Sequence, residues 1–126
     1  QMGLADMRLP IQYALTYPER LKTNFPKFNI LDFPILSFLK PDMETFPCLG
    51  LAYQAIQKGG NMPTIMNAAN EIAVEAFLRG VIGFLEIPEI IANAMSKYNF
   101  IAKANVNDFF FFFLEVREEL SSMLLK

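Results

Sequence analysis

The 126-residue sequence contains no histidine and a single cysteine, Cys48. Without histidine, the chain lacks a common metal ligand and the side chain that most often acts as a general base near neutral pH. A metal site built from these residues would therefore consist of oxygen ligands. One cysteine excludes an internal disulfide and indicates a reducing compartment.

The sequence also lacks long apolar runs and a strong excess of one charge. No segment reaches the roughly 20 apolar residues that a membrane helix requires, and no secretory signal peptide is visible. The 11 basic residues are scattered and outnumbered by 13 acidic ones, which does not indicate nucleic-acid binding. We expect no membrane and no nucleic acid as partner, and we expect a cytoplasmic protein. A plastid stroma stays open, because the sequence starts without methionine and reads as part of a longer protein.

The composition is typical of a globular chain, with 53% hydrophobic and 19% charged residues. Prolines are concentrated between positions 18 and 47, and proline interrupts helices and central strands. Residues 18–45 therefore read as a mostly extended linker. Its most apolar part, Ile30–Leu39, predicts a strand that Pro34 confines to a sheet edge.

Helical patterns lie on both sides of this linker. Before it, Met7–Leu9 predicts a short extended segment, and Pro10 opens a helix that ends before Pro18. After it we expect four helices: one with Thr45 as N-cap that ends at Gly59–Gly60, one from Pro63 to Gly80, one from Ile87 to Tyr98, and one over residues 107–125. The fold class is thus mainly α, with extended N-terminal segments and an edge strand followed by a small antiparallel four-helix bundle over residues 46–126.

The second of these helices places three polar side chains within one turn. Asn67, Asn70 and Glu71 are spaced i, i+3 and i+4 and share a helix face. A packed polar contact with the linker or with another domain, a solvated face, and direct contact with a ligand are all open interpretations. We predict the first, in which these residues dock the bundle, because an unpaired buried polar group costs about 1–3 kcal/mol.

The five consecutive phenylalanines at Phe109–Phe113 point in all directions around a helix. Some of them must be exposed or meet a partner. They are interpreted as an aromatic-rich turn of a core helix, as a binding patch or as a low-complexity accident of the sequence, and the first interpretation is preferred to the binding patch. The run also leaves the register of the last helix open.

Three blocks of sequence, QMGLADMRLPIQYALTYPERL, FPCLGLAYQAIQKGG and NAANEIAVEAFLRGVIGFLEIPEII, together resemble the C-terminal part of the 1-deoxy-D-xylulose-5-phosphate reductoisomerase family. The resemblance implies a homodimeric enzyme with an NADPH-binding domain, a catalytic domain, a linker and a helical bundle. Such enzymes use NADPH and Mg2+ or Mn2+ to convert 1-deoxy-D-xylulose 5-phosphate to 2-C-methyl-D-erythritol 4-phosphate for isoprenoid precursors. Residues 1–17 would then form the end of the catalytic domain.

The resemblance also implies which site residues this chain carries. Met7 matches a family methionine that packs near the nicotinamide and the substrate, and Ala5 stands where the family usually has proline. The family's metal carboxylates, phosphate-binding cluster and glycine-rich cofactor loop precede the matched region. We therefore expect no catalytic residue and no metal ligand in this chain, and a fragment that supports the active site but binds no cofactor and is inactive alone. The alternative is a free-standing helical module that binds a partner protein through its Phe-rich last helix.

Overall fold

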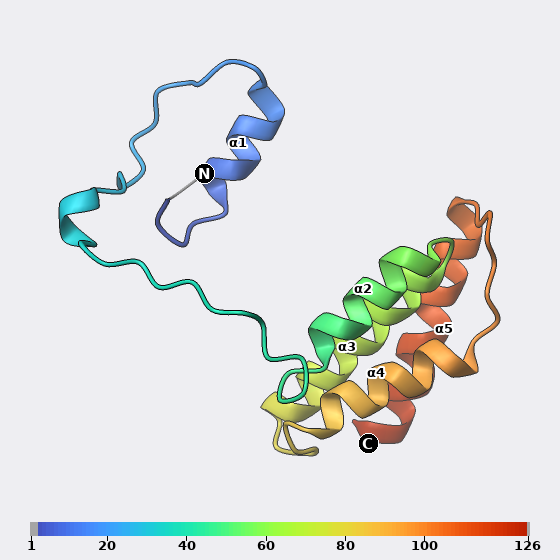
Figure 1. The fold of residues 1–126 in the computed structure, drawn as a ribbon. Coiled ribbons are helices and arrows are strands. Elements are labelled where there is room, and N and C mark those ends of the chain that lie inside the picture. The colour runs from blue at the N-terminus through green and yellow to red at the C-terminus, as the bar shows by residue number, and fades with distance from the viewer. Residues whose placement is uncertain (1–2, 126) are drawn as a thin grey trace. The chain divides into compact units, whose positions relative to one another are not determined.

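The computed structural model describes residues 3–125 and divides the chain into two compact units, residues 1–40 and 41–126 (Figure 1). Helices account for all the regular secondary structure of the described residues. The predicted mainly α fold class is confirmed. The division at residues 17 and 45 into a catalytic segment, a linker and a bundle stays a prediction.

The first unit contains helix α1, Arg8–Thr16, and one 3-10 turn, η1, Ile30–Asp32. The prediction of an extended Met7–Leu9 segment is wrong, because Met7 already has helical backbone angles and the helix starts at Arg8. The Asp6 carboxylate accepts the Arg8 backbone N–H at 3.0 Å, which starts the helix two residues ahead of Pro10. Proline is tolerated there because first-turn N–H groups have no partner within the helix.

The predicted edge strand at Ile30–Leu39 is also wrong for the described residues. The Asn29 side chain accepts the Leu31 N–H at 3.1 Å and nucleates η1, and irregular backbone follows. A strand needs a neighbouring strand for its hydrogen bonds, and none of the described residues supplies one. Apolar side chains in this stretch are exposed; Phe38 and Leu39 are examples.

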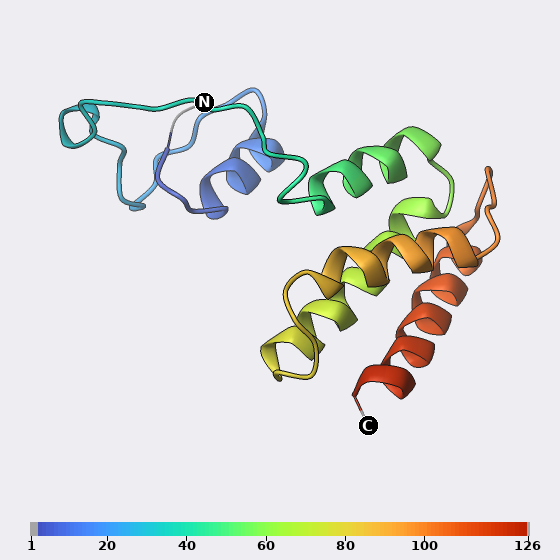
Figure 2. The same cartoon turned by 60° about the horizontal axis from the view of Figure 1, so that its bottom comes forward.

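The second unit consists of helices α2, Cys48–Lys58, α3, Met62–Leu78, α4, Glu86–Lys97, and α5, Val106–Leu124. Consecutive helices reverse direction, as predicted (Figure 1). Helix α3 is central, because it packs against α2, α4 and α5 (Figure 2). None of the helices within residues 3–125 is long and apolar enough to cross a membrane.

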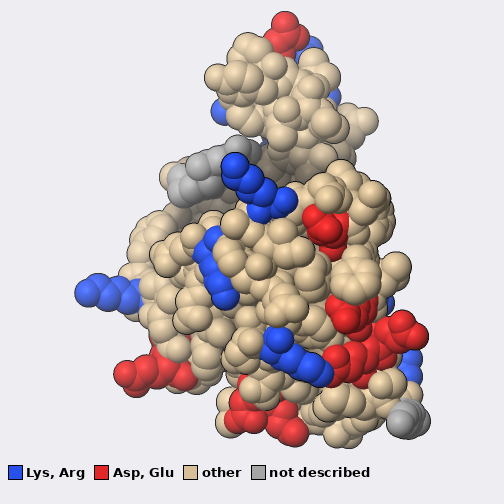
Figure 3. Space-filling view, turned by 90° about the vertical axis from the view of Figure 1, so that its right-hand side faces the viewer, with Lys and Arg blue, Asp and Glu red and all other residues tan. Residues whose placement is uncertain are grey.

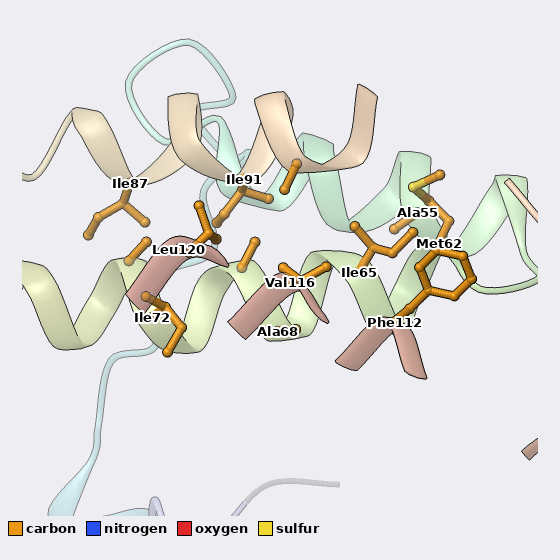
Figure 4. Close-up of a cluster of buried hydrophobic side chains, with 13 residues drawn as sticks. Ala55, Met62, Ile65, Ala68, Ile72, Ile87, Ile91, Phe112, Val116 and Leu120 are labelled. Carbon is orange, nitrogen blue, oxygen red and sulfur yellow. The ribbon is translucent and has the colours of Figure 1, made fainter. Parts of the chain in front are cut away.

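The core of this unit lies along α3 (Figure 4). Ile65 and Ile72 on α3 meet Ile91 of α4 and Val116 of α5, and all four side chains are buried. Helix α3 also carries fully buried alanines between and after its two isoleucines, and their small side chains leave room for the neighbouring helices: Ala68, Ala69, Ala73 and Ala76. The close packing of α3 thus follows from alternating large and small residues.

The helix ends follow local sequence signals with one exception. Glycines with positive φ follow α2 and α3, at Gly59 and Gly80, as predicted. The prediction of Thr45 as an N-cap is wrong, because the cap position is Pro47. The Asp42 carboxylate accepts the Thr45 N–H at 3.0 Å, and this turn ends before the helix begins.

The junction between α2 and α3 is closed against the loop between α4 and α5. Gly60 has a φ of 54°, and a Cβ at this position would lie 2.2 Å from the Ile101 carbonyl oxygen. Asn61, which is fully buried, donates from Nδ2 to the Asn99 carbonyl at 2.9 Å and accepts the Ile101 N–H at 2.9 Å. One amide side chain therefore holds two chain turns together at one end of the bundle.

Candidate functional site

The turn before α1 carries the residues that the sequence analysis placed near a cofactor. Ala5 is exposed, and Met7 is 70% exposed. Both line an open hollow of about 440 Å³ together with Gly3, Leu4, Asp6, Leu9 and Pro10. The structure therefore brings Ala5 and Met7 to one surface, where the Met7 side chain is free to contact an apolar ring.

Two charged residues that the sequence analysis did not single out flank Met7. The Arg8 guanidinium donates from Nε to both Asp6 carboxylate oxygens at 3.0 Å and from a terminal nitrogen to Oδ2 at 2.5 Å. This hydrogen bonding lowers the pKa of Asp6 to about 2. The signal was available in the sequence as opposite charges on either side of Met7, just before the helix.

The Arg8 guanidinium also lies over the Phe25 ring, 4.5 Å from its centroid. This is a cation–π contact, which favours arginine over lysine because the planar guanidinium stacks on the ring. Residues 6–8 are thereby tied to the segment that follows α1.

The three polar residues on α3 do not share one environment. Asn67 donates to Glu71 Oε1 at 3.0 Å, and Arg117 of α5 donates to Glu71 Oε2. Asn70 is half-buried, and its side chain makes no hydrogen bond to any residue between 3 and 125. Glu71 thus links α3 to α5 and Asn67 holds the Glu71 carboxylate from within α3, while the Asn70 amide is available to a further partner.

The phenylalanine run divides among three environments. Phe112 is buried in the core, whereas Phe110 and Phe111 are 64% and 58% exposed. Two half-buried rings line a groove of about 470 Å³ between the starts of α3 and α5, whose lining is Pro63, Thr64, Asn67, Val106, Phe109, Phe110 and Phe113. Asn67 of α3 and the phenylalanine rings of α5, which are far apart in the sequence, line the same groove.

Charged side chains also connect α4 to α5 at the end of α4. Glu119 accepts hydrogen bonds from Lys97 and from the Tyr98 hydroxyl, the latter at 2.6 Å. The Lys97 contact lowers the pKa of Glu119, while burial raises the pKa of Tyr98. On the face drawn in Figure 3, acidic and basic side chains of the described residues both lie among uncharged ones.

A metal site is not formed by the described part of the chain. Among residues 3–125, no three acidic, cysteine or histidine side chains gather in a way that would hold a metal ion. The arrangement at Met7 offers an apolar contact and a fixed turn. It does not offer a set of oxygen ligands.

Residues 2–119 match the family described as the DXP reductoisomerase C-terminal domain. The 1-deoxy-D-xylulose 5-phosphate reductoisomerase of Pelotomaculum thermopropionicum is 56% identical over 98 residues, which cover 78% of this chain and 25% of that protein. The enzyme of the same name from Thermoanaerobacter pseudethanolicus is 46% identical over 129 residues, covering 100% of this chain and 33% of that protein. The chain thus spans about a quarter to a third of the length of these relatives.

Solved structures agree with the sequence comparison. The 1-deoxy-D-xylulose 5-phosphate reductoisomerase from Zymomonas mobilis in complex with NADPH superposes with a TM-score of 0.82 at 37% identity, over 100% of this chain and 33% of that one. A DOX-P reductoisomerase in complex with magnesium gives a TM-score of 0.79 at 32% identity, over 99% of this chain and 34% of that one. Sequence and fold lead to the same conclusion: the chain belongs to the DXP reductoisomerase C-terminal domain family.

Proposed function

We propose that this chain is the C-terminal part of an enzyme that converts 1-deoxy-D-xylulose 5-phosphate to 2-C-methyl-D-erythritol 4-phosphate. The family match over residues 2–119 is the observation that carries the proposal. The reaction is a skeletal rearrangement followed by a reduction, for which bound NADPH supplies the hydride. The helical unit and α1 support the active site, and the chain alone is inactive.

Met7 is the residue of this chain that we place beside the nicotinamide. Its side chain is exposed at the start of α1, and a flexible thioether fills irregular apolar space against a ring. Ala5, on the same surface, replaces the proline that is usual in the family and leaves the turn less rigid. In this proposal Met7 orients the nicotinamide and excludes water from one of its faces.

The remaining binding functions are assigned to the part of the enzyme that lies outside this chain. The described residues do not fit an Mg2+ or Mn2+ site, since no acidic cluster is formed. We therefore place the metal ligands, the cofactor phosphate site and the homodimer contacts in the NADPH-binding and catalytic domains. Because the relatives named above are bacterial proteins, we propose a cytoplasmic enzyme.

Asn67, Asn70 and Glu71 are proposed to dock the helical unit onto those domains. Asn70 supports this role most directly, because its half-buried amide makes no hydrogen bond within residues 3–125. Glu71 contributes indirectly, since its contact with Arg117 fixes the carboxylate next to the proposed docking face. Among residues 3–125 no buried side-chain polar atom lacks a partner, so the Asn70 amide is open to water here and would exchange that water for a protein partner on docking.

A fusion protein tests the proposed function. The part of the T. pseudethanolicus enzyme that precedes the matched region is joined to this chain, and NADPH oxidation is measured with and without 1-deoxy-D-xylulose 5-phosphate. We expect substrate-dependent oxidation by the fusion and none by either piece alone. A folded fusion without turnover would contradict the proposal.

The Met7 assignment is tested in the same fusion. Met7→Ala should reduce kcat by about 10-fold to 100-fold, because small displacements of reacting groups are costly in rate. Met123→Ala is the matched control, since Met123 is a similarly exposed methionine on α5. Unchanged kinetics of Met7→Ala would remove Met7 from the site.

A further inference from the structure

The backbone of Met7 is fixed from both sides. On its C-terminal side, the Met7 carbonyl accepts the Ile11 N–H at 3.1 Å. Around it, Asp6 accepts both the backbone N–H and the guanidinium of Arg8, so that two independent contacts close the chain around Met7. The Met7 side chain remains exposed and is one of those that line the hollow.

Position 5 itself adds no rigidity to this turn. Proline would fix its own φ, whereas alanine leaves the entry to the turn free. Asp6 and Arg8 form a fork, in which Arg8 Nε donates to Asp6 Oδ1 at 3.0 Å and a terminal guanidinium nitrogen donates to Oδ2 at 2.5 Å. This fork restricts the same turn from the other side, because two parallel N–H···O contacts define both distance and orientation.

We propose that the Asp6–Arg8 ion pair is a positioning device that sets the direction in which Met7 meets the nicotinamide. This inference rests on the proposed function, in which Met7 lies beside that ring. In this proposal Asp6 and Arg8 act through the turn that carries Met7 and not on the reacting atoms. Stacking of Arg8 on Phe25 extends the device to the segment after α1.

Three variants of the fusion separate the parts of this device. Asp6→Asn keeps an oxygen that caps the Arg8 N–H, because asparagine and aspartate cap helices equally well, but it loses the two-oxygen fork. Arg8→Lys keeps the positive charge but neither the fork nor the planar stacking. Arg8→Ala removes all of these contacts. Asp42→Asn is the matched control, since Asp42 is an exposed carboxylate that accepts backbone N–H groups at 3.0 and 3.2 Å.

The measurements are kcat, the KM for NADPH, and the isotope effect on kcat with deuterium at the transferred position of NADPH. We expect kcat to fall by about 10-fold or more in Asp6→Asn and in Arg8→Ala, with a smaller loss in Arg8→Lys. The isotope effect should grow in all three, because hydride transfer becomes the slow step. Asp42→Asn should match the parent fusion.

Charge alone would give another pattern. Asp6→Asn and Arg8→Ala change the net charge in opposite directions, so a purely electrostatic influence on the anionic cofactor moves KM in opposite directions. That result with unchanged kcat would overturn the proposal, as would full activity of Arg8→Lys. If Asp6→Asn does not fold, as judged by circular dichroism, Arg8→Lys decides the question.

Failure of this inference differs from failure of the proposed function. If Met7→Ala loses activity while Asp6→Asn and Arg8→Lys keep it, Met7 stays in the site and the ion pair is only a surface contact. If Met7→Ala itself keeps the kinetics of the parent fusion, the proposed place of Met7 is wrong, and the positioning role of Asp6 and Arg8 is then wrong as well.

Discussion

Replacing Asn61 by alanine should lower the free energy of unfolding of the helical unit by about 2–4 kcal/mol. The substitution removes the 2.9 Å contacts to the Asn99 carbonyl and to the Ile101 N–H. Each buried polar group left without a partner costs about 1–3 kcal/mol, and the lower part of the summed range applies where water reaches one of them. This loss is a large share of the roughly 5–15 kcal/mol that stabilises a typical domain.

The assay is urea unfolding of the 126-residue chain, followed by far-ultraviolet circular dichroism. Asn99→Ala is the control, because Asn99 contributes only its backbone carbonyl to the contact and its side chain is exposed. We expect the control to stay within about 0.5 kcal/mol of the parent. A loss below that value for Asn61→Ala would refute the assignment of Asn61 as the link between the two turns.

Asn61→Asp provides an independent check on the same contacts. The aspartate keeps one acceptor for the Ile101 N–H but replaces the donor to the Asn99 carbonyl by an oxygen. Burial disfavours the charged form and raises the pKa of the new carboxyl above its unfolded value of about 3.9. Its protonated form donates again, so the variant should be least impaired below pH 4, and should lose stability as the pH rises through the raised pKa. A variant whose stability does not depend on pH would contradict the buried geometry.

Three further changes probe other parts of the chain. Gly60→Ala should lower the free energy of unfolding in urea by more than about 1 kcal/mol, because φ is 54° and the added Cβ would lie 2.2 Å from a backbone carbonyl oxygen of the α4–α5 loop. In the control Gly50→Ala, within α2, the added Cβ meets no atom within 4 Å and should stabilise the helix. The hydrogen bond from Lys97 is the main cause of the lowered pKa of Glu119, so Glu119 stabilises the fold fully above the ordinary carboxyl pKa and loses this effect as the pH falls through the lowered value. The melting temperatures of the parent and of Glu119→Gln should therefore converge in acid. A constant difference between them at all pH values would count against the contact. Asn70→Leu should leave the isolated chain unchanged or slightly more stable and destabilise the fusion by about 1–3 kcal/mol, and an equal effect on both proteins would end the docking proposal.

The helical unit could be predicted from sequence because its signals are local. Glycines at 59 and 80 require positive φ, and the apolar spacing from Ile87 to Met95 follows one helix face. These signals act within a few residues, and the structure follows them closely. The packing of α5 was less predictable, because five phenylalanines give no preferred face. Contacts distant in sequence place Phe112 in the core, and one of them is the edge-on packing of its ring against Tyr98 at the end of α4.

The segments that precede the helical bundle were harder to predict, since competing local contacts decide their conformation. At Met7–Leu9, an extended segment was expected, but the Asp6 carboxylate starts the helix early. Thr45 was expected to cap α2, but its backbone N–H donates to the Asp42 carboxylate in a turn that precedes the helix. The edge strand at Ile30–Leu39 depends on a partner strand, which a single segment of sequence does not specify.

The Asn61 contacts also bear on the order in which the helical unit folds. They join residues 38 and 40 positions apart in the chain, so all of α3 and all of α4 must be in place before they form. Closing a loop of this length lowers the conformational entropy of the chain before the stabilising contacts across the loop have formed. The end of the bundle at Asn61 should therefore be assembled after the rate-limiting step, which means that weakening it speeds unfolding and leaves the folding rate nearly unchanged.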